Sequence, residues 1–276
     1  MNELNGCHRV SAIFERTRAE HRAAVMPYLT LGYPTPERSL ALVEAAVEGG
    51  ADLLELGLPF SDPLADGPTI QRTTQLALSQ GVTVKRCLKM AEMLRKRGVT
   101  TPFLFMGYYN PILSYGEEAF SQACRRVGVD GLIVPDLPPG EGECLVAACQ
   151  EQGLAQIYLL SPASPGHRIR LITRESQGFV YLVSVNGVTG TRDRLPEDLA
   201  SFVQRVRMMT NKPLAVGFGI SRPDQVAQVA ALADGVIVGS ALMRRAARDG
   251  GVQEVRRFVA RMRKAALREG QGTVSI

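Results

Sequence analysis

The chain has 276 residues, of which 45% are hydrophobic and 21% are charged. This composition is typical of a globular protein with a full hydrophobic core, not of a disordered chain. The formal net charge is only +5, and acidic residues are interspersed throughout, which argues against a nucleic-acid-binding protein.

The first third of the chain predicts helices and strands in alternation. We expect residues 11–21 to form a short charged helix and residues 24–32 to form a strand that ends in glycine. Thr35 and Pro36 then suit the N-cap and the first position of a helix. That helix stops at the glycine pair 49–50, and a second strand follows over residues 51–57.

The same alternation continues to the end of the chain. Further strands are predicted at residues 102–106, 131–134, 155–160, 179–184, 213–217 and 235–238. These short, almost continuously apolar runs suit buried parallel strands, and each precedes a segment with helical periodicity. Between the second and third strands, residues 68–78 and 83–96 supply one helix more than a β/α unit needs.

Eight β/α units predict a (β/α)₈ TIM barrel of the α/β class. The barrel carries an extra N-terminal helix and an extra helix after its second strand. A doubly wound open sheet is the alternative, but no G-x-G-x-x-G motif follows the first strand. No linker or charge block marks a boundary, so we expect residues 1–276 to form a single domain.

The densest basic stretch, residues 256–264, predicts the outer face of an amphipathic helix. Apolar residues recur beside the basic ones at helical spacing, at Val252, Val255, Phe258, Val259 and Met262. A solvated helix face explains this pattern better than a nucleic-acid-binding surface does.

Cysteine and histidine usage limits the chemistry. The five cysteines are Cys7, Cys87, Cys124, Cys144 and Cys149. Their odd number, without metal-binding spacing, predicts reduced thiols and a cytoplasmic protein. The three histidines form no pair, so a zinc site or a histidine triad is not expected. We find no secretory signal and no apolar run long enough to span a membrane.

Residues 54–68 carry the strongest candidate for chemistry. Glu55 stands in an apolar run, and a loop with three prolines follows that carries Asp62 and Asp66. A buried strand carboxyl and a constrained loop carboxyl make a candidate acid/base pair. The alternative is a glutamate that faces water and a capping aspartate.

Strand alternation places Glu55 inside the predicted barrel. The leucines on either side of it belong to the outer face, so Glu55 points inward near the carboxyl end of its strand, where barrel enzymes place their sites. Partial burial there would raise its pKa toward neutrality. Tyr181 and Tyr28 could project into the same space; core packing with a satisfied hydroxyl is the alternative for both.

Glycine-rich turns in the last third predict a phosphate site. Gly190 follows the sixth strand, Gly219 the seventh, and Gly239 with Ser240 the eighth. In barrels, the last two loops and a helix N-terminus commonly bind phosphate through backbone N–H groups. The residues thus predict a barrel enzyme that acts on a phosphorylated small molecule.

Residues 55–71, ELGLPFSDPLADGPTIQ, closely resemble the signature of the tryptophan synthase alpha chain family. The resemblance covers nearly the whole chain. Further matching stretches are PYLTLG (27–32), MGYYNP (106–111), GVTG (187–190), GFGIS (217–221) and GS (239–240).

The resemblance implies a lyase of tryptophan biosynthesis that cleaves indole-3-glycerol phosphate to indole and glyceraldehyde 3-phosphate. It implies that Glu55 is the acid/base, that Asp66 holds the indole N–H and that Tyr181 supports them. The indole pocket implied by the family consists of Tyr28, Ile70, Met106, Tyr108, Thr189 and Phe218. The implied phosphate site consists of Gly190, Gly219, Gly239 and Ser240.

The family also implies a partner. Members pass indole to a beta chain within an α₂β₂ heterotetramer, and pyridoxal phosphate is expected only in that beta chain, so this chain needs no cofactor. Pro59, Asp62 and Pro63 would face the partner, and residues 185–195 would form a lid. A stand-alone lyase that releases free indole and a non-catalytic regulatory subunit are the alternatives; the presence of both Glu55 and Asp66 argues against the second.

Overall fold

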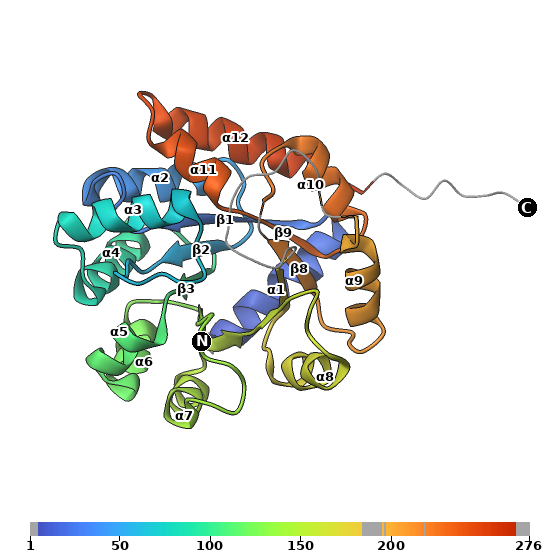
Figure 1. The fold of residues 1–276 in the computed structure, drawn as a ribbon. Helices are drawn as coiled ribbons and strands as arrows, with labels where there is room; N and C mark the ends of the chain where they lie inside the picture. Colours follow the sequence, from blue (N-terminus) through green and yellow to red (C-terminus); the bar gives the residue numbers. More distant parts are fainter. Residues whose placement is uncertain (1–4, 184–194, 196, 218, 269–276) are drawn as a thin grey trace, which may run out of the picture.

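A computed structural model of the chain describes residues 5–183, 195, 197–217 and 219–268. Its strands form one parallel sheet that is surrounded by helices (Figure 1). The strands are β1 (Ala24–Thr30), β2 (Leu54–Gly57), β3 (Phe103–Met106), β4 (Gly131–Ile133), β5 (Ala155–Ile157), β6 (Leu159–Leu160), β7 (Val180–Val183), β8 (Leu214–Gly217) and β9 (Gly235–Val238).

The helices alternate with the strands along the chain. They are α1 (Gly6–Ala19), α2 (Pro36–Glu48), α3 (Pro68–Ser79), α4 (Val84–Lys96), α5 (Tyr109–Tyr115), α6 (Glu117–Arg126), α7 (Glu143–Gln152), α8 (Gly166–Glu175), α9 (Leu199–Arg207), α10 (Pro223–Ala230), α11 (Ser240–Ala246) and α12 (Gly251–Ala265). The predicted barrel is confirmed, with α1 ahead of β1 and two helices, α3 and α4, between β2 and β3.

The fifth predicted strand, residues 155–160, accounts for both β5 and β6. The strand is interrupted at Tyr158, whose N–H donates to the Ser176 hydroxyl (2.9 Å), while its carbonyl accepts from the N–H of Tyr181 (3.2 Å). Because β5 pairs with β4 and β6 pairs with β7, this single stretch closes the sheet order β5-β4-β3-β2-β1-β9-β8-β7-β6 into a barrel.

Local sequence determines where several helices begin and end. Helix α2 starts as predicted: the Thr35 side chain accepts from the N–H of Arg38, and Pro36 is the first helical residue. Helix α1 starts earlier than predicted because Asn5 caps it by accepting from the N–H of His8 (3.0 Å). The segment after β3 forms two helices, where one was predicted, because Gly116 lies at φ +94° between them.

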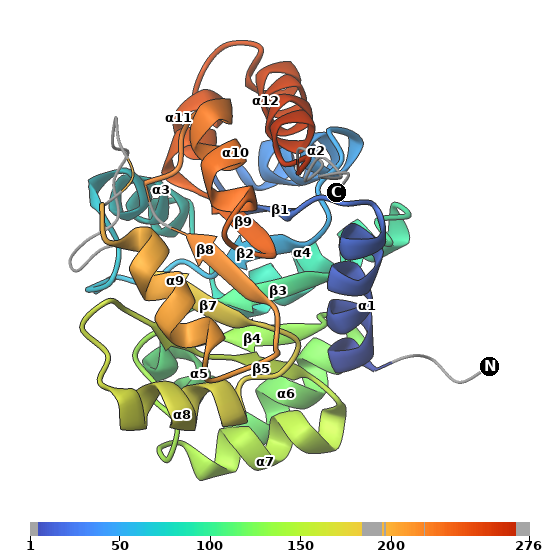
Figure 2. The ribbon, with the colours of Figure 1, turned by 90° about the vertical axis from the view of Figure 1, so that its right-hand side faces the viewer.

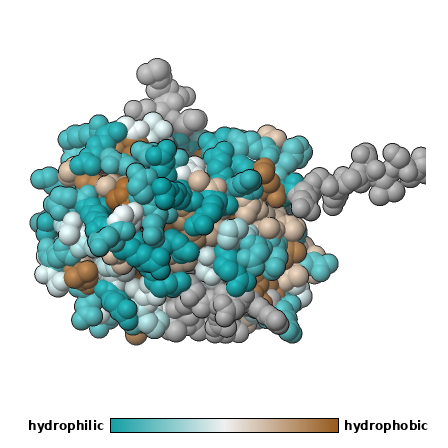
Figure 3. All heavy atoms as spheres, turned by 90° about the horizontal axis from the view of Figure 1, so that it is seen from above, coloured by the Kyte–Doolittle hydropathy of each residue, from teal (hydrophilic) through white to brown (hydrophobic). Residues whose placement is uncertain are grey.

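The two ends of the barrel have different roles. Helix α1 covers the amino-terminal ends of the strands, and its Phe14 ring lies 5.4 Å from the ring of Phe179, just before β7 (Figure 2). The carboxyl ends stay available for loops. Helix α12 packs its Val255, Phe258 and Met262 side chains inward, as predicted, and the surface seen from its side of the molecule is mainly hydrophilic (Figure 3).

Three aspartates stabilise the end of the barrel where the strands begin. Each lies one or two positions before a strand, and its carboxylate accepts the N–H of a residue in a neighbouring strand. The pairs are Asp52 with Val25 (2.9 Å), Asp130 with Phe103 (2.9 Å) and Asp234 with Leu214 (3.0 Å). These carboxylates therefore help to set the register of adjacent strands.

Arginines neutralise the same three carboxylates. Arg22, only 3% exposed, donates two hydrogen bonds to Asp52, at 2.6 and 2.7 Å, and Arg95 donates to Asp130 at 2.7 Å. Asp234 pairs with Arg207 and Arg268. Both partners of each pair are needed, because a buried charge without its counter-ion destabilises the fold.

Within the described ranges, no helix is both long and apolar enough to cross a bilayer.

Candidate active site

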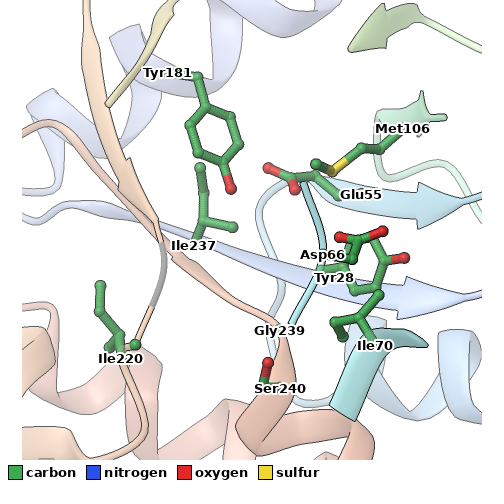
Figure 4. A pocket seen from close by; sticks show the side chains of 11 residues that line it. Tyr28, Glu55, Asp66, Ile70, Met106, Tyr181, Ile220, Ile237, Gly239 and Ser240 are labelled. Carbon is green, nitrogen blue, oxygen red and sulfur yellow. The ribbon is translucent and has the colours of Figure 1, made fainter. Parts of the chain in front are cut away.

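A cavity lies inside the barrel at the carboxyl ends of the strands, with an empty volume of about 450 Å³. The described residues that line it are Tyr28, Glu55, Asp66, Ile70, Met106, Tyr181, Gly219, Ile220, Ile237, Gly239 and Ser240 (Figure 4). Two carboxyl groups and two phenols face each other there among apolar side chains.

Glu55 projects into the cavity from β2. Leu54 and Leu56 pack in the core on the opposite face of the strand, so strand alternation turns Glu55 inward. Its side chain is fully buried, and neither carboxyl oxygen has a hydrogen-bond partner among the described residues. Burial raises the pKa of Glu55 to about 8, so this group carries a proton at neutral pH.

Asp66 comes from the proline-rich loop that follows β2 and is 9% exposed. The Tyr108 hydroxyl donates to its carboxylate at 3.2 Å, and the Gln71 side-chain amide donates to its backbone carbonyl at 2.8 Å. Burial raises the pKa of Asp66 to about 6, while the Tyr108 hydrogen bond opposes that shift. Asp66 is therefore largely ionised at neutral pH, unlike Glu55.

The two carboxyl groups thus differ in protonation state within one cavity. A neutral carboxylic acid can donate a proton, and a nearby carboxylate can stabilise positive charge. Environments that separate the pKa values of two titratable groups in this way are a sign of acid/base chemistry.

Tyr28 and Tyr181 flank the acid. Tyr28 on β1 is paired in register with Glu55 on β2, and the Tyr181 hydroxyl faces Glu55 across the cavity (Figure 4). Both phenols are buried, which, with the nearby carboxyl charges, holds each pKa well above its ordinary value. They are therefore neutral. Since neither oxygen of Glu55 is hydrogen-bonded among the described residues, Tyr181 faces that carboxyl without a hydrogen bond to it.

Glycines make room for these phenols. A Cβ atom at Gly57 would lie 2.0 Å from the Tyr28 hydroxyl oxygen, and one at Gly217 would lie 2.5 Å from the Tyr181 hydroxyl oxygen. Any side chain at either position would displace a tyrosine from the cavity. The strand pattern gave no reason to single out these two glycines.

A second end of the cavity is lined by Gly219, Ile220, Gly239 and Ser240. Of these, Ile220 and Ser240 are seen away from the Glu55 carboxyl group in Figure 4. Gly219 has φ +84°, and Ser240 is the first residue of α11. Among the described lining residues there is no lysine or arginine, so backbone N–H groups and the Ser240 hydroxyl are what this end offers to an anion.

The structure brings together most of the predicted site residues. Ile70 and Met106 line the same cavity as the two carboxyl groups, whereas Tyr108 lies behind Asp66 and bonds to it. Thr189, Gly190 and Phe218 lie outside the described residues. Ile220 and Ile237 line the cavity but were not predicted, although alternation from Gly235 along β9 would have turned Ile237 inward.

The residues predicted to face a partner lie on one loop beside the cavity. Asp62 is exposed, Pro63 is partly exposed and Pro59 is buried. Next to them Leu64 is 86% exposed, which leaves a large apolar side chain in solvent. Within the described part of the chain, no group of three or more His, Cys, Asp or Glu residues is placed to hold a metal ion.

The sequence of the chain is similar to those of known proteins. The family model described as tryptophan synthase alpha chain matches residues 14–269. The tryptophan synthase alpha chain of Dehalococcoides mccartyi is 47% identical over 257 residues, which is 93% of this chain and 98% of that protein. The alpha chain of Chloroflexus aggregans is 50% identical over 238 residues, covering 86% of this chain and 89% of that protein.

Solved structures agree in fold. A chain of Mycobacterium tuberculosis tryptophan synthase superimposes with a TM-score of 0.87 at 40% identity, covering 94% of this chain and 98% of that one. The alpha subunit from Legionella pneumophila superimposes with a TM-score of 0.86 at 38% identity, covering 94% of this chain and 98% of that one. The chain therefore belongs to the tryptophan synthase alpha chain family.

Proposed function

We propose that this chain is a lyase that cleaves indole-3-glycerol phosphate to indole and glyceraldehyde 3-phosphate, the alpha reaction of tryptophan biosynthesis. The observation that carries the proposal is the pair of buried carboxyl groups, Glu55 with a pKa of about 8 and Asp66 with a pKa of about 6, in the cavity of a family member. A retro-aldol cleavage of an indole needs one acid at carbon and one anion at nitrogen.

Proton transfer to the ring comes first. The Glu55 carboxylic acid donates its proton to C3 of the indole, which turns the ring into an electron acceptor with positive charge at its nitrogen. The Asp66 carboxylate accepts a hydrogen bond from the indole N–H and stabilises that charge. Glu55 suits this step because its proton is present at neutral pH, and Asp66 suits it because its charge is present.

Bond cleavage follows. The Glu55 carboxylate takes the proton from the hydroxyl on the carbon next to the ring. The bond between that carbon and C3 then breaks, its electron pair returns to the ring, and the products are indole and the aldehyde. Glu55 ends protonated, as it began. Tyr181, neutral and facing Glu55, supports the acid from across the cavity.

The substrate spans the cavity from one end to the other. The indole would contact Tyr28, Ile70 and Met106, and the phosphate would take backbone N–H groups from Gly219, Gly239 and Ser240. Support comes from the fact that all of these residues line one cavity and from the usual phosphate site of barrel enzymes.

A beta chain is the proposed partner, in an α₂β₂ heterotetramer that passes indole on. The loop around Asp62 and Pro63, which lies beside the cavity and is largely exposed, would face it. This chain would need no cofactor, since proton transfer by Glu55 and charge stabilisation by Asp66 complete the reaction; pyridoxal phosphate would belong to the beta chain. We also propose one domain over residues 1–276 and a cytoplasmic location.

The test is an indole-release assay on the purified chain, with and without a beta chain. The proposal expects glyceraldehyde 3-phosphate and indole in equal amounts, and faster turnover when the beta chain is added. Equally fast release of free indole by the chain alone would favour a stand-alone lyase. No cleavage under either condition would contradict the proposal.

A further inference from the structure

Tyr108 holds the loop that carries Asp66 by three contacts. Its ring packs against Phe60 at one end of the loop, with centroids 5.4 Å apart. Its hydroxyl accepts the N–H of Ala65 at 2.9 Å and donates to the Asp66 carboxylate at 3.2 Å. Tyr108 is itself 6% exposed, so one buried side chain fixes both the loop and its carboxylate.

The position of Tyr108 is fixed in turn by its own neighbours. It is the N-cap residue of α5, two positions after the end of β3. The Asp136 carboxylate, from the loop after β4, accepts the N–H of Tyr109 with both oxygens, at 3.0 and 3.2 Å. These hydrogen bonds hold the first turn of α5 in place. The Tyr108 ring at this helix terminus therefore gives the loop that carries Asp66 a fixed contact.

We propose that Tyr108 is a positioning residue for Asp66: its hydroxyl, oriented by the N–H of Ala65, aims the Asp66 carboxylate at the cavity so that it meets the indole N–H. Tyr108 acts through Asp66 and does not itself line the cavity. The inference rests on the proposed function, since it assigns Asp66 the task of stabilising positive charge on the ring.

The hydrogen bond also affects the charge on Asp66. The titratable groups that face this carboxylate are Tyr28 on β1, Glu55 on β2, Tyr108 after β3 and Tyr181 on β7. All four are neutral at neutral pH, so a donated hydrogen bond is the means of favouring the ionised form. The Tyr108 hydroxyl lowers the pKa of Asp66 against the larger effect of burial.

The test compares Tyr108→Phe with Tyr109→Phe. The first keeps the ring against Phe60 and removes only the hydroxyl. The second removes a hydroxyl that bonds to Glu117 at 2.8 Å, outside the cavity. We expect Tyr108→Phe to lower kcat roughly tenfold to a hundredfold with little change in KM, and to move the acid limb of the pH profile to higher pH, because Asp66 then binds its proton more tightly. Tyr109→Phe should change neither.

A double-mutant cycle gives the sharpest form of the test. If Tyr108 acts through Asp66, the Tyr108→Phe change should have almost no further effect on kcat in an Asp66→Asn background. Additive losses, or a lower kcat with an unmoved acid limb, would overturn the proposal and indicate a merely structural role.

A carboxyl NMR titration of the unliganded chain separates this inference from the proposed function. A higher pKa for Asp66 in Tyr108→Phe supports the coupling, and an equal pKa overturns it, whichever reaction the chain catalyses. Failure of the wild-type chain to release indole would instead contradict the proposed function alone.

Discussion

Replacing Glu55 by glutamine should make the fold more stable at alkaline pH. Burial raises the pKa of Glu55 from its ordinary value of 4.5 to about 8. Below pH 4.5 the group is protonated in both the folded and the unfolded chain. Between pH 4.5 and about 8 only the folded chain keeps the proton, so stability falls as pH rises through this window. Each pKa unit is worth about 1.36 kcal/mol, which gives a loss of at most about 5 kcal/mol above pH 8.

The glutamine variant cannot ionise at this position and should escape that loss. We expect its free energy of unfolding, relative to wild type, to rise between pH 5 and pH 9 by up to about 4 kcal/mol, because about three pKa units of the window lie above pH 5. Any constant cost of burying the amide cancels in this comparison. Urea unfolding followed by far-UV circular dichroism is the assay, since the chain contains no tryptophan.

Glu151→Gln is the matched control, because Glu151 is exposed on α7. Its difference from wild type should not depend on pH. A Glu55→Gln difference that is equally independent of pH would refute the reasoning, since Glu55 would then ionise as an exposed carboxyl does.

Three further predictions concern the site and its support. Asp66→Asn should raise the barrier of the cleavage by about 3 kcal/mol, seen as a lower kcat in steady-state indole release; a change in KM alone would mean that Asp66 only binds substrate. The kcat/KM of the wild-type enzyme should follow a bell with limbs near pH 6 and pH 8, because activity needs ionised Asp66 and protonated Glu55; a flat profile from pH 5 to 9 would be inconsistent with these roles. Asp52→Asn should cost about 3 kcal/mol of stability, because it removes the carboxylate that binds both terminal nitrogens of the buried Arg22 and leaves that charge with the partly exposed Glu20 alone, while exposed Asp62→Asn should cost little; thermal unfolding compares the two.

The orientation of Glu55 was predictable because it follows from local rules. A strand alternates, and Leu54 and Leu56 fix which face is outward. The start of α2 was predictable for the same kind of reason, since Thr35 and Pro36 act within one turn of the helix. Where neighbouring residues determine the outcome, the sequence alone was sufficient.

The contacts that position Asp66 and interrupt the strand at Tyr158 join segments that are far apart in the sequence, which explains why they were not predicted. Tyr108 and Asp66 are 42 positions apart, and only the closed barrel brings their loops together. The interruption at Tyr158 depends on a hydroxyl 18 positions away, so the apolar run 155–160 gave no sign of it. The pKa values of Glu55 and Asp66 depend on burial by the whole barrel. Strand alternation indicated only the direction of the shift at Glu55 and gave no indication of the shift at Asp66, which lies on a loop.

The most direct test of the account is the turnover of indole-3-glycerol phosphate by Glu55→Gln. Glutamine keeps the shape of the side chain and cannot donate the proton to C3 or take the proton from the hydroxyl. The account predicts that indole release falls by roughly 10²–10⁴-fold or more, while calorimetry still detects substrate binding. Indole release near the wild-type rate would contradict the assignment of Glu55 as the acid and base of the reaction.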